Sequence, residues 1–248
     1  MSQIKTIVMK FGGTSVEDEA TRKLMVKHII REVEAGFKVL VVVSAMGRLG
    51  AAYATDTLGS LVSEKITPRE SDRLLSCGEV ISSIVTSDLV RSHGLSVTSL
   101  APVEIGIVTD TNHTDAHILI VDTRELLEKF EIFDVLIAPG FIGVSEEGFI
   151  TTLGRGGSDT SAIALGASLD AEFVDIYSDV IGVMTEDPNK KDSNAVLISE
   201  MTYDELIEIA EAGAQIIHLK AIKLAKDCEV SMRFRSTFED FVGTVVKG

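Results

Sequence analysis

Apolar, β-branched runs alternate with amphipathic segments along nearly the whole chain. Strand-like runs occupy residues 4–9, 38–44, 95–100, 135–138, 171–177 and 230–234. Between them, apolar side chains recur with helical spacing over residues 18–34, 55–62, 69–93, 122–130, 202–212 and 217–227. A hairpin is expected at residues 146–148, which end in glycine. The almost wholly apolar run KVLVVVS is typical of a parallel strand buried on both faces. The alternation predicts an α/β sandwich around a mainly parallel sheet.

A glycine-rich turn, GRGG at residues 154–157, follows one short strand end. Ser158 is placed to cap a helix that begins near residue 160. Free amides at a helix start attract anions, and Arg155 held there can bind a carboxylate through two hydrogen bonds. Asp159 adds an opposite charge for an amine or a positioned water. The turn therefore predicts a site for a small zwitterionic or anionic ligand, with an ordinary strand-to-helix turn as the alternative.

A second glycine turn, KFGGTS at residues 10–15, joins the first predicted strand to a helix. It lacks the final lysine of a Walker A loop and the third glycine of a dinucleotide fingerprint, so neither motif is matched. From the strand end, the ammonium of Lys10 could reach a phosphoryl group that the amides of Gly12 and Gly13 also contact. Neutralising charge is the main demand of phosphoryl transfer. A solvated strand end is the alternative interpretation.

Other chemical groups lie near predicted strand ends or in a buried helix. Ser44 ends the second strand, at the edge where open α/β sheets bind ligands. Glu79 stands in a helical stretch that should be mostly buried, so its carboxylate needs a partner, either a ligand ammonium or a surface lysine. Residues 178–188 form a long connection marked by glycine and proline. The connection would either wrap a nucleotide, with Met184 against the adenine, or be a simple excursion.

Histidine and cysteine positions give no clear metal site. His113 and His117 are spaced i, i+4, which on a helix suits a pair of metal ligands. No HExxH pattern or third ligand accompanies them, so we expect solvated or capping side chains. Cys77 and Cys228 belong to no CxxC or Cys/His pattern, which predicts reduced thiols with a mostly structural role.

Composition and charge narrow the class of protein. The chain has 248 residues, 45% of them apolar, enough for one large domain or two closely packed lobes. Its net charge of −15 disfavours nonspecific binding to nucleic acid or to an anionic membrane surface. The amino terminus enters a strand pattern without a signal-peptide hydrophobic region, and no apolar run has the length of a membrane span. A cytoplasmic protein is expected.

Five stretches carry a more specific pattern. They are KFGGTSV at residues 10–16, SAMG at 44–47, LSCGE at 75–79, TTLGRGGSDT at 151–160, and SDV at 178–180 followed by Asp187 and Pro188. In order and approximate spacing they resemble the catalytic domain of aspartate kinases, in the amino acid kinase family, over nearly the whole chain. The resemblance implies one domain with a three-layer αβα sandwich. Its substrate lobe would span about residues 1–165 and its nucleotide lobe about residues 166–248.

The resemblance also implies a reaction, the ATP-dependent phosphorylation of the side-chain carboxylate of L-aspartate to 4-phospho-L-aspartate. Lys10 would neutralise the transferring phosphoryl group, and Asp159 would organise the active centre. In the substrate pocket, Arg155 would bind a carboxylate and Glu79 the amino group, completed by Ser44 and Ser158. The nucleotide site would comprise Gly12, Gly13, Ser178, Asp179, Met184, Asp187, Pro188, Lys190 and Gln215. Magnesium would arrive with ATP, because no dedicated protein cage is visible.

The chain departs from the family pattern on the expected nucleotide side. Ile181 replaces the second aspartate of a usual DVDG, Asn189 a usual arginine, and Gln215 a usual lysine. The last two changes remove positive charge, and charged contacts to phosphate are worth about 1.5–3 kcal/mol each. We expect a working kinase with altered nucleotide contacts. Nearby lysines could supply the missing charge: Lys190, Lys191 and Lys220.

Two alternative functions stay open. One is a kinase of the same fold acting on another small amino acid or acid, and the other is a catalytically impaired regulatory subunit that binds an amino acid. Aspartate kinases usually continue into ACT regulatory domains, whereas this sequence stops at Gly248, shortly after the expected end of the kinase domain. We expect no ACT domain and a homodimer. Without an ACT domain, the protein would be unregulated, be regulated by a separate subunit, or serve a specialised pathway.

Overall fold

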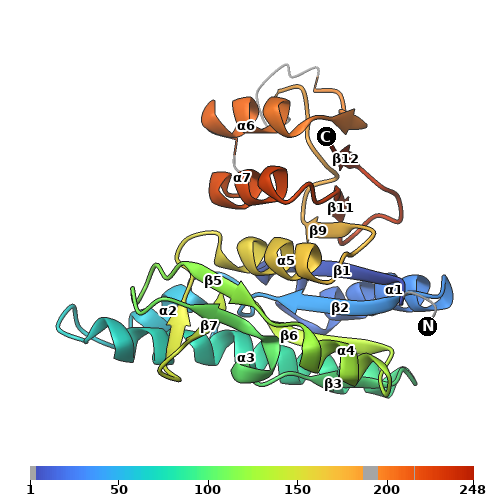
Figure 1. The fold of residues 1–248 in the computed structure, drawn as a ribbon. Helices are drawn as coiled ribbons and strands as arrows, with labels where there is room; N and C mark the ends of the chain where they lie inside the picture. The colour runs from blue at the N-terminus through green and yellow to red at the C-terminus, as the bar shows by residue number, and fades with distance from the viewer. Residues whose placement is uncertain (1–3, 187–194, 215) are drawn as a thin grey trace.

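The computed structural model describes residues 4–186, 195–214 and 216–248, and these form the expected α/β architecture (Figure 1). The central sheet of the described chain has eight strands in the order β10-β12-β11-β9-β1-β2-β6-β3. Their bounds are β1 Thr6–Phe11, β2 Lys38–Val43, β3 Val97–Ser99, β6 Val135–Pro139, β9 Val174–Ser178, β10 Glu200–Met201, β11 Met232–Ser236 and β12 Thr244–Val246. Neighbouring strands are parallel except β11 and β12. The predicted, mainly parallel sheet is confirmed.

A smaller sheet of four strands, in the order β5-β4-β7-β8, lies beside the first. Its strands are β4 Ile107–Thr109, β5 Ile118–Val121, β7 Ile142–Ser145 and β8 Ile150–Thr152. Strands β7 and β8 are antiparallel and enclose Gly148 at φ 83°, so the predicted hairpin is confirmed. Strands β4 and β5 flank a polar loop and were not predicted from the sequence. The small sheet positions the end of β8, from which the glycine-rich turn continues.

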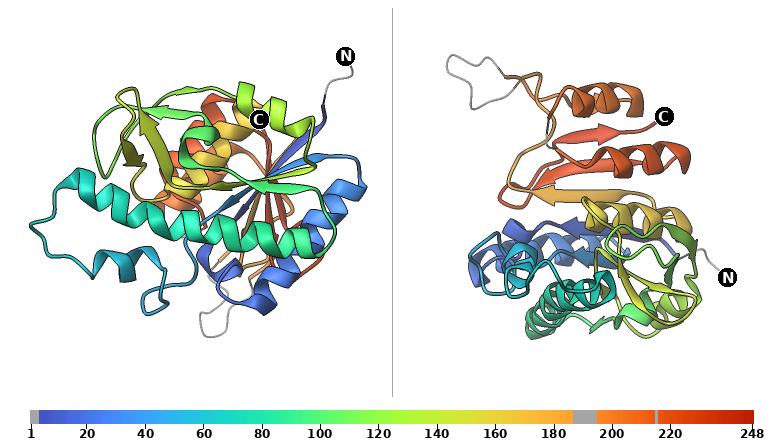
Figure 2. Two further views of the ribbon diagram at one scale, coloured as in Figure 1. Left: turned by 90° about the horizontal axis from the view of Figure 1, so that it is seen from below. Right: turned by 90° about the vertical axis from the view of Figure 1, so that its left-hand side faces the viewer.

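Helices cover both faces of the central sheet (Figure 2). They are α1 Glu19–Glu34, α2 Thr55–Gly59, α3 Pro68–Ser92, α4 Arg124–Phe130, α5 Gly157–Ser168, α6 Tyr203–Glu211 and α7 Leu219–Asp227. Short 3-10 turns span Gly13–Ser15 and Pro102–Ile105. Thr202 caps α6 through a capping box with Glu205. No helix in the described ranges is long and apolar enough to cross a membrane.

Strand β2 explains why the domain has three layers. Its side chains are buried on both faces. Val39, Val41 and Val43 join a core cluster with α1 and α3, whereas Leu40 and Val42 join the opposite cluster with α4, α5, α6 and α7. A strand with alternate side chains in two cores must lie between two helical layers. The αβα sandwich follows from this pattern.

Helix α5 begins earlier than the sequence pattern predicted. Its N-cap is Gly156, at φ 73°, and the helix starts at Gly157 rather than near residue 160. The interpretation of Ser158 as the N-cap is therefore wrong, because this residue already lies in the first helical turn. Glycine takes the left-handed conformation without the steric penalty that other residues incur, which permits the earlier start. As a result, Ser158 and Asp159 project from the first turn of the helix.

Both cysteines lie at the surface. Cys77 and Cys228 are exposed free thiols in the described structure. The sequence predicted reduced thiols with a mostly structural role, and neither side chain belongs to a core cluster of the described residues. Cys77 lies on the outer side of α3, whose inner side carries the buried Glu79.

Candidate active site

Consecutive strand ends build one edge of the central sheet. The backbone bonds continue past the strands: Gly140 donates to Val43, Ser44 to Phe11, and Gly12 to Tyr177, at 2.9, 3.1 and 3.4 Å. The loops after β6, β2, β1 and β9 therefore lie side by side at the carboxyl ends of parallel strands, where open α/β sheets bind ligands.

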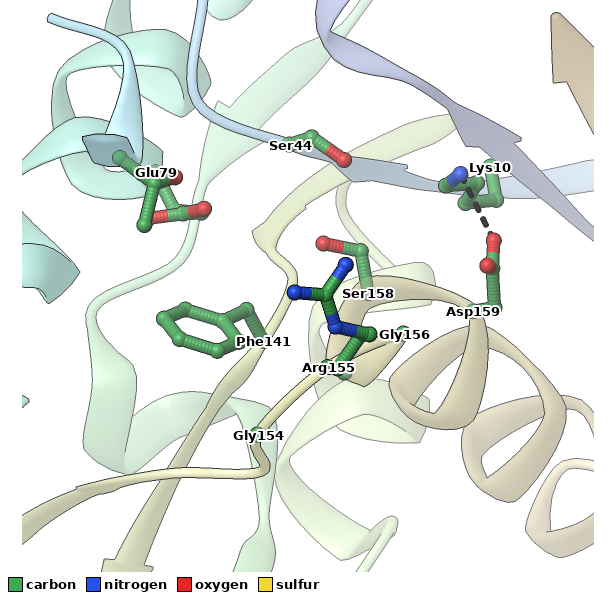
Figure 3. A pocket seen from close by; sticks show the side chains of 11 residues that line it. Lys10, Ser44, Glu79, Phe141, Gly154, Arg155, Gly156, Ser158 and Asp159 are labelled. Carbon is green, nitrogen blue, oxygen red and sulfur yellow. Dashed lines mark ion pairs between the residues drawn. The ribbon is translucent and has the colours of Figure 1, made fainter. Parts of the chain in front are cut away.

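A cavity of about 270 Å³ opens at this edge (Figure 3). Its wall comes from strand β1, from the residues that follow β2 and Gly140, from helices α2, α3 and α5, and from the glycine-rich turn. It is lined by Lys10, Ser44, Thr55, Glu79, Phe141, Gly154, Arg155, Gly156, Gly157, Ser158 and Asp159. Both predicted catalytic residues and all four predicted substrate-binding residues thus line a single cavity.

Lys10 and Asp159 form an ion pair in this cavity. The distance from Lys10 Nζ to Asp159 Oδ1 is 2.7 Å, and each side chain is 13% exposed. Lys10 extends from β1, while Asp159 comes from the first turn of α5. The sequence suggested Asp159 as a partner for a ligand amine or a water, but in this structure its partner is the amine of Lys10. Asp159 therefore holds the lysine ammonium at the cavity wall.

Glu79 is a buried carboxylate with an unpartnered oxygen. The residue is 2% exposed, on the inner side of α3. Its Oε1 accepts a hydrogen bond from the Ala45 amide at 3.2 Å, and its Oε2 has no partner within the described residues. Burial raises the pKa of Glu79 from 4.5 to about 8, against the opposing effect of the Ala45 amide. The predicted burial is confirmed, and the alternative of a surface lysine partner is wrong. A buried, unpartnered carboxylate favours a cationic ligand group.

Arg155 brings the opposite charge to the same cavity. The side chain is exposed and has no ion-pair partner in the described structure. Figure 3 shows its guanidinium directed into the cavity beside Ser158 and the ring of Phe141. The flanking glycines, Gly154 and Gly156, have φ 72° and 73°, so the backbone turns sharply on both sides of the arginine. The turn therefore projects the guanidinium toward Ser44 and Ser158 at the cavity wall.

The turn after β1 packs closely against the loop after β2. Gly47 donates its amide to the Gly13 carbonyl at 3.0 Å, and a Cβ at Gly13 would lie 2.6 Å from the Gly47 oxygen. Only glycine fits there without a shift of backbone. The Gly12 amide already donates to Tyr177 over a long 3.4 Å, whereas no bond from the Gly13 amide is found within the described residues. The Gly13 amide is therefore the better donor for an incoming anion.

The predicted nucleotide residues after β9 lie outside the cavity wall. Ser178 Oγ accepts from the Val180 amide at 3.3 Å, and Asp179 pairs with Arg48 at 3.3 Å in an exposed ion pair. Met184 is half-buried and forms a β-bridge with Leu197. Because β9 neighbours β1, these residues begin next to the Gly12 turn.

Several predicted nucleotide-side positions fall outside the described residues. These are Asp187, Pro188, Asn189, Lys190, Lys191 and Gln215. Of the lysines considered as substitutes, Lys220 is described: its Nζ lies 3.3 Å from both Asp115 Oδ1 and the Leu153 carbonyl. Lys220 thus contacts the residue that precedes the glycine-rich turn.

Two side chains in the cavity wall were missed from the sequence. Phe141 follows the strand end at Pro139 and Gly140 and has φ 68°, a conformation that bulky residues rarely adopt. The sequence does not reveal this backbone conformation. Thr55 opens α2, and no local pattern distinguishes it from other helix starts. Both residues reach the cavity because of the tertiary fold of the chain, and the composition of their segments gives no sign of it.

The histidine pair does not lie on a helix. His113 and His117 belong to the loop between β4 and β5, and each contacts a separate aspartate. His113 Nδ1 lies 2.6 Å from the buried Asp72, and His117 Nδ1 lies 2.9 Å from Asp110. Across the described part of the chain, no three His, Cys, Asp or Glu side chains gather as a metal site would require. The helical metal pair is therefore ruled out in this geometry.

Comparisons with known proteins agree with the motif pattern. The model of the amino acid kinase family matches residues 5–236. The chain is 45% identical to aspartokinase 1 of Bacillus subtilis over 98% of its length, and 36% identical to an aspartate kinase from Synechocystis, with a TM-score of 0.86 over 98% of this chain and 40% of that one. A structure of Escherichia coli aspartokinase III with aspartate and ADP matches at 25% identity and a TM-score of 0.84, over 98% of this chain and 65% of that one.

The chain covers only part of the length of these relatives. The chain spans 61% of the Bacillus subtilis protein and 58% of a 43% identical aspartokinase from Geobacillus stearothermophilus. The family model nevertheless matches from just before β1 to the end of β11, and the predicted family is confirmed. This chain belongs to the amino acid kinase family.

Proposed function

We propose that this domain transfers the γ-phosphoryl group of ATP to the side-chain carboxylate of L-aspartate. One observation carries the proposal: an unpartnered buried carboxylate, an exposed guanidinium and a paired lysine line the same cavity. The acceptor offers an ammonium and two carboxylates, which match this set of charges. Relatives named aspartokinase at 43–45% identity, and a similar structure solved with aspartate and ADP, support the assignment.

The acceptor would be held at both ends. Glu79 Oε2 would accept from the ammonium, while the guanidinium of Arg155 would bind a carboxylate through two hydrogen bonds. The hydroxyls of Ser44 and Ser158 would complete the pocket. Two-point binding fixes the orientation of a small flexible acid, and this raises the effective concentration of the reacting oxygen.

Charge neutralisation would promote the transfer step. An oxygen of the acceptor carboxylate attacks the γ-phosphorus, the bond from that phosphorus to the β–γ bridging oxygen breaks, and ADP leaves with the electron pair. No covalent enzyme intermediate is needed. The ammonium of Lys10 and the amides of Gly12 and Gly13 would oppose the negative charge on the transferring group. Asp159 holds Lys10 in place through the 2.7 Å ion pair.

The nucleotide would extend from the glycine turn across the end of β9. We assign Ser178, Asp179 and Met184 to this side, together with four positions outside the described residues: Asp187, Pro188, Lys190 and Gln215. The site fits an anionic cosubstrate, because the Gly13 amide donates to no described residue and a Cβ on the neighbouring Gly12 would lie 3.7 Å from Lys10 Nζ. Mg²⁺, bound to the phosphates, would supply further charge neutralisation.

The proposal extends to the two lobes of the domain and to its assembly. The acceptor residues lie before residue 165 and the remaining nucleotide residues after it, which supports a substrate lobe of about residues 1–165 and a nucleotide lobe of about residues 166–248. We also propose a cytoplasmic homodimer. Light scattering after gel filtration measures its mass directly.

Trapping the product tests the proposed function. Purified protein is incubated with ATP and magnesium, with and without L-aspartate, and hydroxylamine converts any acyl phosphate to a hydroxamate. The expected result is hydroxamate that depends on aspartate and disappears in Lys10→Ala. Parallel reactions with L-glutamate, succinate and L-asparagine identify the groups that the acceptor needs. Product from another acid but not from aspartate would overturn the acceptor assignment, and no product from any acid would overturn the kinase assignment.

A further inference from the structure

Asp72 forms a buried junction between three segments of the chain. The residue is 0% exposed and lies on α3. Its carboxylate accepts from the Thr152 hydroxyl at 2.6 Å, from the Thr114 amide at 3.0 and 3.2 Å, and from His113 Nδ1 at 2.6 Å. Hydrogen bonds to a buried carboxylate are stronger than those between neutral groups. Asp72 therefore joins helix α3, the loop after β4, and strand β8.

Two of these segments carry the charges that face the acceptor cavity. Asp72 and Glu79 are seven positions apart, which is about two helical turns, so they share the inner side of α3. Thr152 ends β8 and is separated from Arg155 only by Leu153 and Gly154. The junction thus links the helix that holds Glu79 to the strand from which the Arg155 turn continues.

The third segment braces that turn directly. The Ala116 amide donates to the Thr152 carbonyl at 2.9 Å. Asp115 packs so closely on Gly154 that a Cβ there would lie 2.5 Å from Asp115 Oδ1. Thr114, next in the loop, has φ 73°, a conformation that a threonine adopts only when its surroundings impose it. The bonds to Asp72 supply that constraint.

We propose that the Asp72–His113 pair sets the position of the Arg155 turn relative to Glu79, and so determines how well the acceptor binds. Both are positioning residues, because neither lines the cavity. The inference rests on the proposed function for the nature of the acceptor, but the bracing of the turn is independent of it. His113 thereby takes a role other than the solvated or capping role that the sequence predicted.

The same loop contains a matched control. His117 also contacts an aspartate, Asp110, at 2.9 Å. That pair is exposed, with side-chain exposures of 62% and 34%, whereas those of His113 and Asp72 are 15% and 0%. Alanine at either position removes one histidine–aspartate contact from one loop, and only the His113 change loosens the buried junction.

The experiment compares His113→Ala, His113→Asn and His117→Ala with the wild type. The first readout is hydrogen–deuterium exchange in peptides that cover residues 153–157. The amide of Asn can occupy the place of His Nδ1 and keep a donor to Asp72. Faster exchange is expected in His113→Ala, with wild-type exchange in His113→Asn and His117→Ala. Equal exchange in all four proteins would overturn the inference, even if the protein had no aspartate kinase activity.

The second readout separates acceptor binding from nucleotide binding. In His113→Ala, the KM for L-aspartate should rise roughly tenfold or more, the loss expected for a hydrogen bond to a charged group. The KM for ATP should stay within about twofold, and His113→Asn should restore the acceptor KM. Equal changes in both KM values, or the same change in His117→Ala, would overturn the inference, because they would show that His113 has only a general structural role. A wild type without aspartate turnover would contradict the proposed function alone.

A second substitution approaches the junction from strand β8. Thr152→Val keeps the shape of the side chain and removes only its hydrogen bond to Asp72. We expect the same selective rise in the acceptor KM and faster exchange over residues 153–157. If Thr152→Val and His113→Ala both leave these readouts at wild-type values while the protein stays folded, the junction does not position the turn.

Discussion

Two groups of charged side chains in the described structure differ in whether their charges have partners of opposite sign. In the cavity at the carboxyl ends of the strands, Glu79 Oε2 has no hydrogen-bond partner and Arg155 no ion-pair partner among the described residues. In the second group, between α1 and strands β9 and β11, Asp175 accepts two hydrogen bonds from Arg233 at 2.6 and 2.9 Å. Arg235 approaches the same carboxylate at 3.5 Å.

The second group continues along α1. Arg31 donates to Glu32 at 2.9 Å and to the Tyr177 hydroxyl at 3.3 Å, and it pairs with Asp240. Burial lowers the pKa of His28 there and raises that of Tyr177, so both are neutral at ordinary pH. Positive and negative groups alternate in this set and form ion pairs with one another. We call this set, residues 28, 31, 32, 175, 177, 233, 235 and 240, the α1–β9–β11 cluster.

The difference shows which buried charges indicate ligand binding. Charge that is neutralised inside the fold needs no further partner, so its removal should reduce stability and leave binding intact. Charge that is buried without a partner is unfavourable in the empty protein and becomes favourable only when a ligand supplies the opposite charge. Substitutions at four positions separate these two outcomes.

Arg233→Ala should have the largest effect, and this effect should be on stability. The change leaves Asp175 buried without its two-bond partner, which costs about 3–5 kcal/mol in comparable pairs. Urea unfolding followed by circular dichroism measures the loss. Arg124→Ala is the control, since it breaks an exposed pair with Asp122 and should leave the unfolding midpoint essentially unchanged. Unaltered stability in Arg233→Ala would show that the α1–β9–β11 cluster does not stabilise the fold.

Lys10→Ala should affect turnover rather than folding. Removal of a group that stabilises charge in the transition state typically lowers kcat by about 10²–10³-fold. The rate of aspartate-dependent ADP formation measures this change. Lys23→Ala serves as the control, because Lys23 forms a surface pair with Glu19 away from the cavity. A decrease in kcat smaller than about tenfold would remove Lys10 from the transfer step.

Glu79→Gln should stabilise the empty protein at alkaline pH. Because burial raises the pKa of Glu79 from 4.5 to about 8, the folded state holds this proton more tightly than the unfolded state. Its contribution to stability therefore falls as the pH rises from about 4.5 to about 8 and is unfavourable above that range. Relative to wild type, Glu79→Gln should gain several kcal/mol by pH 9 and little below pH 4.5, because each unit of pKa shift corresponds to about 1.4 kcal/mol. A gain that does not depend on pH would contradict the buried-carboxylate assignment.

Arg155→Ala should have the smallest effect in free energy and should act only on the acceptor. The loss of a two-bond contact to a carboxylate is worth about 1.5–3 kcal/mol, or a roughly 10–150-fold rise in the KM for L-aspartate. Thermal unfolding should be unchanged, because the side chain is exposed and unpartnered in the described structure. Arg155→Lys should recover part of the affinity, since lysine keeps the charge but not the planar fork. Reduced thermal stability in Arg155→Ala would show that this arginine stabilises the fold, as the charges in ion pairs do, and would contradict a role in ligand binding alone.

The sequence predicted the parts of the fold that long patterns encode. The β-branched runs that became β1, β2 and β9 identified the parallel sheet, and helix α3 was recognised from its apolar spacing. Strands β4, β5 and β10 have between two and four residues and were missed, because so few positions cannot establish a period. Ser158 was assigned as a cap because a serine before an apolar run is the commoner arrangement, whereas the left-handed Gly156 ends the turn earlier.

The sequence predicted individual residues of the site but not the contacts between them. Glycine turns, a lone arginine and a glutamate in an apolar helix could be selected locally. The Lys10–Asp159 ion pair and the contact of Asp72 with Thr152 join residues that are distant in sequence, so no local pattern contains them. Phe141 reaches the cavity through its positive φ, which only the tertiary structure reveals.

Proton release on acceptor binding tests the central claim most directly, namely that the unpartnered carboxylate of Glu79 binds the ligand ammonium. L-aspartate is titrated calorimetrically at pH 7 in two buffers that differ in ionisation enthalpy. With a pKa of about 8, Glu79 is mostly protonated in the empty protein and must lose its proton to pair with an ammonium. We predict the release of about one proton per aspartate bound by wild type and almost none by Glu79→Gln. Binding without proton release, or equal release from both proteins, would contradict the account.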